Sequence, residues 1–317
     1  MTKQPSKLNS RLDYKDNVTL RAQRTTKVIN KTFVYFFLVL IALFILIPFY
    51  WMLNISFQST QEAMWSVTPS LFPREFSPSN YVVIFQQGAA GGGPLANVTF
   101  WNFLGNTFVV AFFSTAIGTL FAILVAFALA KFNFKGRELI FILMLATMMI
   151  PSEMFLVTNF MTVSALGWRN QENVLAYVAL VVPFTVSIFQ IFLLRQTFRQ
   201  VPNELYYAAK VDGCKDFKYL WTVMVPMAKS SIIVIVILRV MSSWNSFTWP
   251  QLVAHPRFRL VTSWLRGSFR DETAGQVMNI INLQMAATVT VTVPLLILFV
   301  VARKYIMTGI SRSGVKG

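Results

Sequence analysis

Few residues of this 317-residue sequence have side chains suited to acid–base, nucleophilic or metal chemistry. The chain holds one His (His255), one Cys (Cys214) and 12 Asp and Glu residues, against 28 Lys and Arg. A metal cluster needs several such ligands and a covalent mechanism needs a nucleophile beside a base, and the sequence shows neither. It also has no phosphate-binding loop of the form Gly-x-x-x-x-Gly-Lys followed by Ser or Thr. We therefore expect no enzyme activity, no metal and no cofactor on this chain.

One set of polar residues does occur inside an apolar stretch. Arg239, Ser242, Ser243 and Ser246 follow one another at i, i+3, i+4 and i+7, so they share one face of a helix. Burying an arginine in a membrane costs about 2.5–3.5 kcal/mol on insertion scales. We therefore expect Arg239 to face a water-filled path, where it meets an anionic group of a substrate, or a partner subunit, where it pairs with an acid or with backbone carbonyls. The partner subunit is the favoured interpretation.

The elements that position these residues are predicted to be membrane-spanning helices, in an all-α integral membrane protein. Apolar residues make up 55% of the chain and charged residues only 13%, too few charges to cover a soluble fold of this size. A helix crosses the hydrocarbon core with about 20 mostly apolar residues. Six such runs occur: Val34–Leu53, Thr107–Ala130, Leu139–Met161, Val174–Leu194, Ser231–Trp249 and Leu283–Ala302. Membrane helices tolerate proline, and four of the runs contain one: Pro48, Pro151, Pro183 and Pro294.

The net charge of +16 indicates orientation rather than nucleic-acid binding. Of the 28 Lys and Arg residues, 21 lie in residues 1–33, 131–138, 195–230 and the tail from Arg303, all on one side of the predicted membrane. Because cytoplasmic loops are enriched in Lys and Arg, this side is predicted to be cytoplasmic, with both termini. Residues 1–33 are predicted to form a flexible, basic cytoplasmic arm, and residues 34–317 the transmembrane domain. The first apolar run is too long for a signal peptide, so we expect it to stay as an anchor.

The cytoplasmic segment of residues 195–230 is too long for a simple turn. Asn203 is a candidate N-cap for a helix that begins at Glu204, and Gly213 is expected to end that helix. A second helical stretch is predicted from Lys215 to Pro226. Mostly small side chains would let a partner protein approach the first helix closely on the face of Leu205, Ala208, Ala209 and Asp212. An amphipathic helix that lies on the membrane surface without a partner explains the pattern equally well.

A spacing pattern runs through this segment. Tyr207-Ala208-Ala209 is followed by three residues, Gly213, nine further residues and Val223-Met224-Val225-Pro226. The pattern resembles the Glu-Ala-Ala loop of inner-membrane subunits of binding-protein-dependent ABC importers, which continues to Gly and then to Ile-x-Leu-Pro. Glu204 matches an acidic residue common just upstream. Tyr207 stands where the family usually has Glu, so a salt bridge at that position is not carried over.

Further segments resemble the carbohydrate importers of this family. Ser243-Trp244-Asn245, Phe247 and Trp249-Pro250 are similar to their Trp-Asn…Trp-Pro segment, and the likeness to the maltose-type second permease subunit covers nearly all of the chain from the first span onward. The resemblance implies a type I ABC importer permease fold with six transmembrane helices and both termini cytoplasmic. It also implies a second permease subunit in a heterodimer, two ATPase subunits that hold ATP and Mg, an extracytoplasmic solute-binding protein and a saccharide substrate. In that family the loop docks into a cleft of the ATPase, and the matching positions here are Glu204, Tyr207, Ala208, Ala209, Asp212, Gly213 and Pro226.

The candidate lining of the substrate path lies around the fifth apolar run. Its members are Arg239, Ser242, Ser243, Trp244, Asn245, Ser246 and Trp249. The two tryptophans are expected either to stack on sugar rings or to anchor the helix at the membrane interface. Glu153 is expected to be a hydrated helix-end group and His255 a surface residue. Four outer-side arginines are expected to contact an acidic face of the binding protein or to attract an anionic ligand: Arg257, Arg259, Arg266 and Arg270.

Alternative functions belong to other classes of protein. A stand-alone secondary transporter is expected to carry intramembrane carboxylates and paired broken helices, whereas only Glu153 lies inside a predicted span. An importer permease for a non-sugar solute would share the loop pattern but not the Trp-Asn…Trp-Pro segment. The expected setting is the bacterial cytoplasmic membrane, with lipid around the helices.

Overall fold

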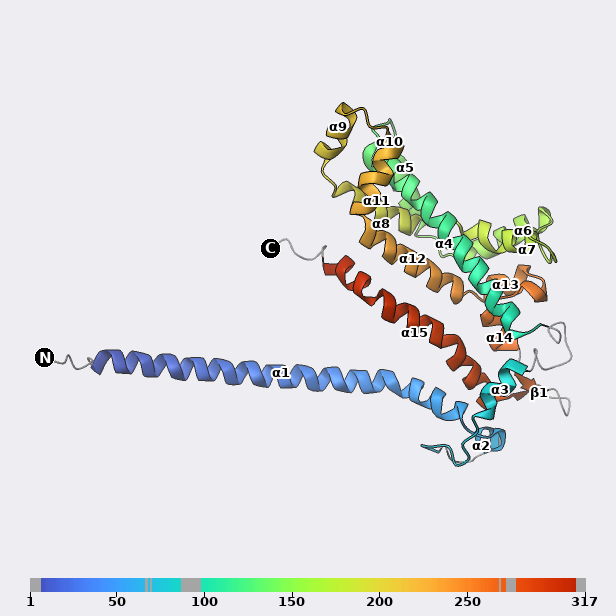
Figure 1. The fold of residues 1–317 in the computed structure, drawn as a ribbon, viewed down its shortest axis with the longest axis horizontal. Helices are drawn as coiled ribbons and strands as arrows, with labels where there is room; N and C mark the ends of the chain where they lie inside the picture. The colour runs from blue at the N-terminus through green and yellow to red at the C-terminus, as the bar shows by residue number, and fades with distance from the viewer. Residues whose placement is uncertain are drawn as a thin grey trace. The chain divides into compact units, whose positions relative to one another are not determined.

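The computed structural model describes residues 7–65, 68, 70–86, 98–267, 269–271 and 278–311. It is helical apart from one antiparallel ladder of two residues a side. In chain order the elements are α1 Lys7–Ser56, α2 Thr60–Trp65, α3 Ser79–Gln86, α4 Phe100–Lys131, α5 Arg137–Thr147, α6 Met154–Ala165, α7 Leu175–Val181, η1 Val182–Phe184, α8 Ile188–Arg199, α9 Asn203–Val211, α10 Asp216–Tyr219, η2 Leu220–Met224, α11 Val225–Met227, α12 Lys229–Trp244, α13 Thr248–Val253, η3 Pro256–Phe258, α14 Val261–Gly267, β1 Arg270–Asp271, β2 Met278–Asn279 and α15 Ile281–Ser311 (Figure 1).

The chain divides into two units, Met1–Asn54 and Ile55–Gly317. In the first unit, α1 is already helical from Lys7, so the expectation of a flexible arm over residues 1–33 is wrong for its described part. No Gly or Pro occurs between Lys7 and Ile47, and a helix extends from an existing end without a second nucleation cost. The cytoplasmic placement of this segment stays a prediction.

Three helices of the described chain are long and apolar enough to cross a membrane. They cover Asn30–Ser56, Phe100–Lys131 and Ile281–Lys304 and coincide with the first, second and sixth predicted runs. Two bent helix pairs qualify if each is taken as one span: Leu175–Phe184 with Ile188–Arg199, bent by 55°, and Asp216–Met227 with Lys229–Trp244, bent by 82°. The described helices therefore supply three spans, or up to five.

The third, fourth and fifth predicted runs are not continuous helices, which corrects the sequence prediction. In the third, α5 ends at Thr147 and α6 begins at Met154, with Pro151 in the break. In the fourth, η1 contains Pro183 and α8 starts only at Ile188. A proline cannot donate the backbone hydrogen bond that a helix needs, and its ring clashes with the preceding turn. A helix therefore tends to break at proline unless other groups bond the carbonyl that is left without a donor.

The fifth run ends early, because α12 stops at Trp244. The next residue, Asn245, donates its side-chain amide to the Met241 carbonyl at 2.9 Å, which satisfies one of the carbonyls that a helix end leaves open. Ser246 therefore lies in the connection to α13, and Trp249 belongs to α13 itself.

The second unit is built around α4. This helix packs against α8, α12 and α14, and α12 in turn contacts α15. Gly118, Ala122 and Ala126 of α4 are buried, and such small side chains let neighbouring helices approach closely. A core cluster joins α4 to α8 and to the segment after α10 through Leu194, Phe198 and Met224.

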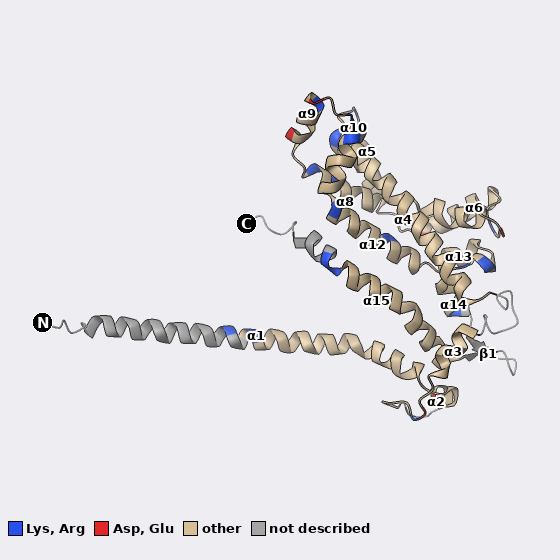
Figure 2. Ribbon diagram, in the orientation of Figure 1, with Lys and Arg blue, Asp and Glu red and all other residues tan. Residues whose placement is uncertain are grey.

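Charged side chains are unevenly distributed in the second unit. They gather at the end that holds α9 and α10, whereas α4, α12 and α15 are largely uncharged along their lengths (Figure 2). This distribution agrees with α9 lying outside the apolar spans.

Candidate functional site

The predicted helix–glycine–helix element is present as α9 and α10. Gly213, between them, has φ +73°, a left-handed conformation that glycine adopts at little cost and most other residues avoid. The turn closes through backbone hydrogen bonds from Gly213 to Lys210 at 3.0 Å and from Cys214 to Ala209 at 2.8 Å. The predicted role of Gly213 in ending the first helix is confirmed. The second stretch is not one α-helix, because a π-helical turn over Leu220–Met224 separates α10 from α11.

The start of α9 differs from the prediction. Asn203 is the first residue of the helix rather than its N-cap, and Pro202 precedes it. The Asn203 side chain does not cap the helix, because its Oδ1 accepts a hydrogen bond from Lys131 Nζ at 2.8 Å. A lysine 72 residues away in the sequence therefore competes successfully for the oxygen that we expected to bind the backbone.

The inner face of α9 holds the helix against α10 and the core. Tyr206 packs edge-on against Tyr219, with ring centroids 5.2 Å apart, and donates its hydroxyl to Asp216 Oδ1 at 2.7 Å. Lys210 forms an ion pair with the same Asp216 oxygen at 2.7 Å. Ala209, which was expected to share a face with Leu205, Ala208 and Asp212, is half-buried and packs against the core cluster.

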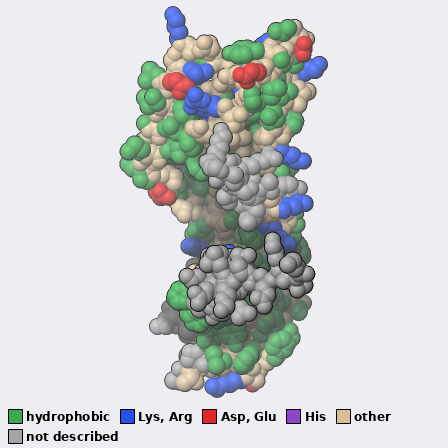
Figure 3. Space-filling view, turned by 90° about the vertical axis from the view of Figure 1, so that its left-hand side faces the viewer, with side chains coloured by type: hydrophobic (Ala, Val, Ile, Leu, Met, Phe, Trp, Pro, Cys, Tyr) green, Lys and Arg blue, Asp and Glu red, His purple; other side chains and the backbone are tan. Residues whose placement is uncertain are grey.

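The outer face of α9 and α10 is exposed and partly apolar. Glu204, Leu205, Ala208 and Asp212 are exposed, as is Pro226 beyond them. Tyr207 is 64% exposed, Val211 88% and Phe217 65%, and the last two were not among the residues predicted from the sequence. At this end of the molecule, exposed hydrophobic side chains lie among acidic and basic ones (Figure 3). We call the set of Leu205, Tyr207, Ala208, Val211, Asp212 and Phe217 the docking face.

Arg239 is buried inside its own chain, with 5% of its surface exposed. Its Nη1 donates to the Ser114 carbonyl of α4 at 3.0 Å, Nη2 donates to the Thr185 carbonyl in the break before α8, and Nε donates to Gln190 Oε1 of α8. Among the described residues no carboxylate forms an ion pair with it. The predictions that Arg239 faces a water-filled path or a partner subunit are therefore wrong, because the bend in the chain at Thr185 offers an internal acceptor.

Gly118 leaves the space that the Arg239 guanidinium fills. A Cβ atom at position 118 would come closer than 3.0 Å to Arg239 Nη1, Cζ and Nη2. Real Cβ atoms essentially never make contacts that short. Gly118 and Arg239 therefore form a matched pair between α4 and α12.

The two tryptophans of the candidate path are core residues. Trp244 is 3% exposed and packs edge-on against Phe108, and Trp249 is 4% exposed and donates its indole N–H to the Ala179 carbonyl at 3.0 Å. Neither is available to stack on a sugar or to anchor a membrane interface, so both predictions for them are wrong. Ser242 and Asn245 are exposed and Ser243 and Ser246 half-buried, with the Ser246 carbonyl accepting a hydrogen bond from Thr262. The predicted polar face thus divides, with Arg239 inside the bundle and Ser242 outside it.

The charges predicted to lie on the outer side are partly paired within the chain. His255, expected to be a surface residue, is half-buried, and its Nε2 lies 3.2 Å from Glu172, which also contacts Arg257 at 3.6 Å. Arg266 is exposed, and its guanidinium lies 4.3 Å from the centre of the Phe247 ring. The side chain of Arg270 lies outside the described residues, and Arg259 is half-buried.

Glu153 matches the prediction of a helix-end group. It is exposed at the N-terminus of α6, and Ser152 donates a hydrogen bond to it at 3.2 Å.

Across the described residues, no group of three or more His, Cys, Asp or Glu side chains is arranged to hold a metal ion.

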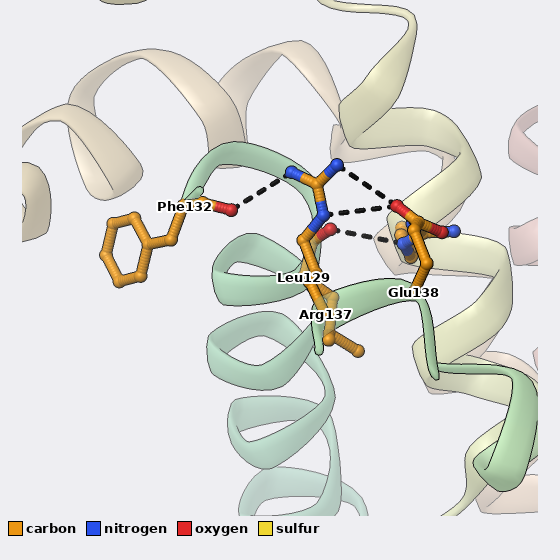
Figure 4. Close-up of polar contacts among 5 residues, drawn as sticks. Leu129, Phe132, Arg137 and Glu138 are labelled. Carbon is orange, nitrogen blue, oxygen red and sulfur yellow. Dashed lines mark hydrogen bonds and ion pairs between the residues drawn. The ribbon is translucent and has the colours of Figure 1, made fainter. Parts of the chain in front are cut away.

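A polar cluster that the sequence did not predict lies at the ends of α4, α5 and α8. Arg195, only 2% exposed, donates to both Glu138 oxygens at 2.7 and 2.8 Å and to the Leu129 carbonyl at 3.2 Å. Its guanidinium also lies 3.7 Å from the centre of the Phe141 ring. Arg137 bridges Glu138 and the Phe132 carbonyl (Figure 4). The hydrogen bond from Arg195 holds the pKa of Glu138 below its ordinary range.

The long apolar helices around α4 define a multi-pass helical membrane protein. Residues 118–312 match the family described as binding-protein-dependent transport system inner membrane component, and the chain belongs to this family. The family comprises transport subunits of the inner membrane rather than enzymes. Membership also decides against a secondary transporter that works alone.

Known proteins similar to this chain agree with that family. The probable ABC transporter permease protein MG189 of Mycoplasma genitalium is 28% identical over 309 residues, covering 96% of this chain and 94% of that protein. The arabinooligosaccharides transport system permease protein AraQ of Bacillus subtilis is 27% identical over 282 residues, covering 89% and 94%. A chain in the crystal structure of a bacterial ABC transporter involved in the import of the acidic polysaccharide alginate has the same fold, with a TM-score of 0.71, 21% identity and coverage of 96% of this chain and 99% of that one.

Proposed function

We propose that this chain is a permease subunit of an ATP-driven importer for oligosaccharides. It forms half of a translocation path together with a second permease subunit. Two ATPase subunits, which hold ATP and Mg, drive the cycle, and an extracytoplasmic solute-binding protein delivers the substrate. The family description and the arabinooligosaccharide permease among its relatives support this assignment.

The proposed topology has six spans with both termini in the cytoplasm, as in a type I importer. The continuous helices supply the first, second and sixth spans, and the two bent pairs contribute to the fourth and fifth. The third is assembled from α5 and α6, which are 11 and 12 residues long and too short to cross the membrane singly. The excess of Lys and Arg on one side of these helices supports the orientation.

The docking face is the observation that carries the proposal. Val211 and Phe217 are large apolar side chains, 88% and 65% exposed, on either side of the turn at Gly213, and their helices are tied to the core through Tyr206 and Tyr219. Exposed apolar surface on a firmly held element is typical of a protein–protein contact. We assign this contact to the ATPase subunit, through residues 204–226.

The substrate path is proposed to run past the polar groups that remain exposed near the end of α12. Ser242 and Asn245 are exposed there, and Thr248 is exposed at the start of α13. Hydroxyl and amide groups suit the hydroxyl groups of a saccharide, because they both donate and accept hydrogen bonds. With Arg239, Trp244 and Trp249 buried, these smaller side chains are the better candidates for substrate contacts.

The docking assignment is tested by substitution of Gly213. Gly213→Val forces a β-branched residue into a left-handed conformation, which costs about 1–3 kcal/mol and is relieved only if the turn between α9 and α10 changes. We expect this variant to insert into the membrane but to lose both co-purification with the ATPase subunits and ATP-driven uptake. Gly213→Asn is the matched control, because Asn tolerates this conformation, and it should keep most of the activity. Normal uptake by Gly213→Val would show that the turn does not shape a docking surface.

A further inference from the structure

The end of α4 is joined directly to the start of the docking element. Lys131 is the last residue of α4, and its Nζ donates to the Val201 carbonyl and to Asn203 Oδ1, both at 2.8 Å. Val201 lies in the short connection after α8, and Asn203 is the first residue of α9. One ammonium group therefore holds both the connection and the helix that carries the docking face.

This lysine sits where a charge is costly to keep. Lys131 is only 9% exposed, and among the described residues it contacts no carboxylate, although Glu204 lies near enough to act on it electrostatically. A methionine of similar length would fill the same space without the cost of removing an ammonium from water. Stability of the fold alone therefore does not account for a lysine here. Hydrogen bonds that fix the position of α9 relative to α4 do account for it.

A second set of hydrogen bonds joins α8 to α4 and α5. Arg195 of α8 donates to the Leu129 carbonyl of α4 and, through both oxygens of Glu138, binds the start of α5. Since α8 leads into α9 through only three residues, Gln200 to Pro202, the base of the docking element is held by covalent linkage to α8 and by hydrogen bonds to α4. We call Lys131, Asn203, Arg195 and Glu138 the cytoplasmic clamp.

We propose that the cytoplasmic clamp transmits displacement of α9 to α4 and α8, and that Lys131 is the positioning residue that makes this transmission efficient. The inference rests on the proposed docking of α9 to an ATPase subunit. When a partner displaces a helix, the displacement reaches neighbouring helices only if the start of that helix is held in place. Lys131 holds the start of α9 against the end of α4. Because α4 packs along α8 and α12, a displacement that enters at Lys131 reaches the helices that line the proposed path.

The test separates docking from transmission in the assembled importer. Lys131→Met keeps the apolar stem and removes the donors. Reconstituted with its partner subunits and the binding protein, this variant should still co-purify with the ATPase subunits and hydrolyse ATP. Substrate transported per ATP should fall about tenfold, within the roughly 5- to 150-fold range of coupling between distant sites in proteins. Lys135→Met is the matched control, because Lys135 is exposed in the loop directly after α4, and its ratio should equal that of the wild type.

A second pair of variants probes the other side of the contact. Asn203→Asp keeps an acceptor for Lys131 and should preserve the transport ratio, whereas Asn203→Leu removes the acceptor and should lower it in the same direction as Lys131→Met. If Lys131→Met fails to fold and assemble, the two Asn203 variants still test whether the Lys131–Asn203 contact is needed for transport.

Three results of these transport and co-purification experiments would count against the proposals, each in a different way. A transport ratio within twofold of the wild type for both Lys131→Met and Asn203→Leu would overturn the clamp. Loss of the ATPase subunits from a folded Lys131→Met permease would also overturn it, because Lys131 would then shape the docking face itself. Failure of the wild-type chain to co-purify with any ATPase subunit would instead reject the proposed function on which the clamp depends.

Discussion

Replacing Gly118 by alanine adds one methyl group at the centre of the second unit, against the Arg239 guanidinium. The new Cβ would come closer than 3.0 Å to three guanidinium atoms, so the guanidinium has to leave its place. The arginine side chain is flexible enough to do so. The steric clash is therefore inexpensive in itself, and the cost arises from what the guanidinium gives up.

The magnitude follows from the contacts of Arg239. Its hydrogen bonds to Ser114, Thr185 and Gln190 share one rigid planar group, so they are lost together when that group moves. A buried charge that loses its partners costs about 3–5 kcal/mol. Alanine inside a helix is more stable than glycine by roughly 0.5–1 kcal/mol, which offsets part of this cost. We therefore expect Gly118→Ala to lower the free energy of unfolding by about 2–4 kcal/mol net, and uptake with it.

The assay is a double-mutant cycle with a control on the same helix. Gly105 also lies in α4, but a Cβ there meets nothing within 4 Å, so Gly105→Ala should be neutral or slightly stabilising. In an Arg239→Met background, Gly118→Ala should cost almost nothing, because no guanidinium remains to be displaced. Reversible unfolding in mixed micelles measures the free energies, and uptake by the reconstituted importer measures function. Additive effects of the two substitutions would refute the pairing of Gly118 with Arg239.

The two buried arginines, Arg239 and Arg195, give two further predictions. Arg239→Ala should reduce the uptake of neutral and of acidic oligosaccharides by the same factor, since Arg239 binds its own chain; a selective loss of acidic substrates in a transport assay would mean that the arginine meets the ligand. Because the pKa of Glu138 is lowered in the folded protein, its pairing with Arg195 contributes stability that is complete above the ordinary carboxyl pKa and is lost as the pH falls through the lowered value. The difference in thermal stability between the wild type and Glu138→Gln should therefore be constant at neutral pH and disappear in acid, and a difference that persists at low pH would contradict the assignment.

Features encoded by short stretches of sequence were predictable. The apolar runs that became α4 and α15 were found from hydropathy, because about 20 consecutive apolar residues have few other folds available. The turn at Gly213 was predictable for a similar reason, since a glycine that follows a helical stretch is a common helix end. The family resemblance carried by the spacing around that glycine led to the correct family.

Features that depend on distant residues were not predictable. Arg239 binds Ser114, 125 residues away, and Trp249 binds Ala179, 70 residues away. A helical pattern shows which residues share a face but not what the face meets, so Arg239 and Ser242 were placed together although one is buried and the other exposed. The break at Pro151 was missed for a related reason: proline remains inside α15 at Pro294, and whether a helix continues past a proline depends on its neighbours.

The buried polar residues of the second unit fasten α4 along its length. Near the N-terminal end of α4, Asn106 donates to the Arg257 carbonyl at 2.7 Å and accepts from Tyr177 at 2.7 Å. In the middle, Arg239 binds the Ser114 carbonyl, and at the other end Lys131 binds the Val201 carbonyl. Inside a membrane the lipid is as apolar as the helices, so apolar burial does not drive their association, and hydrogen bonds together with close packing at small residues take its place. A charge within a span of this chain therefore marks a fastening point between helices, and the search for substrate contacts belongs with the exposed uncharged groups around Ser242 and Asn245.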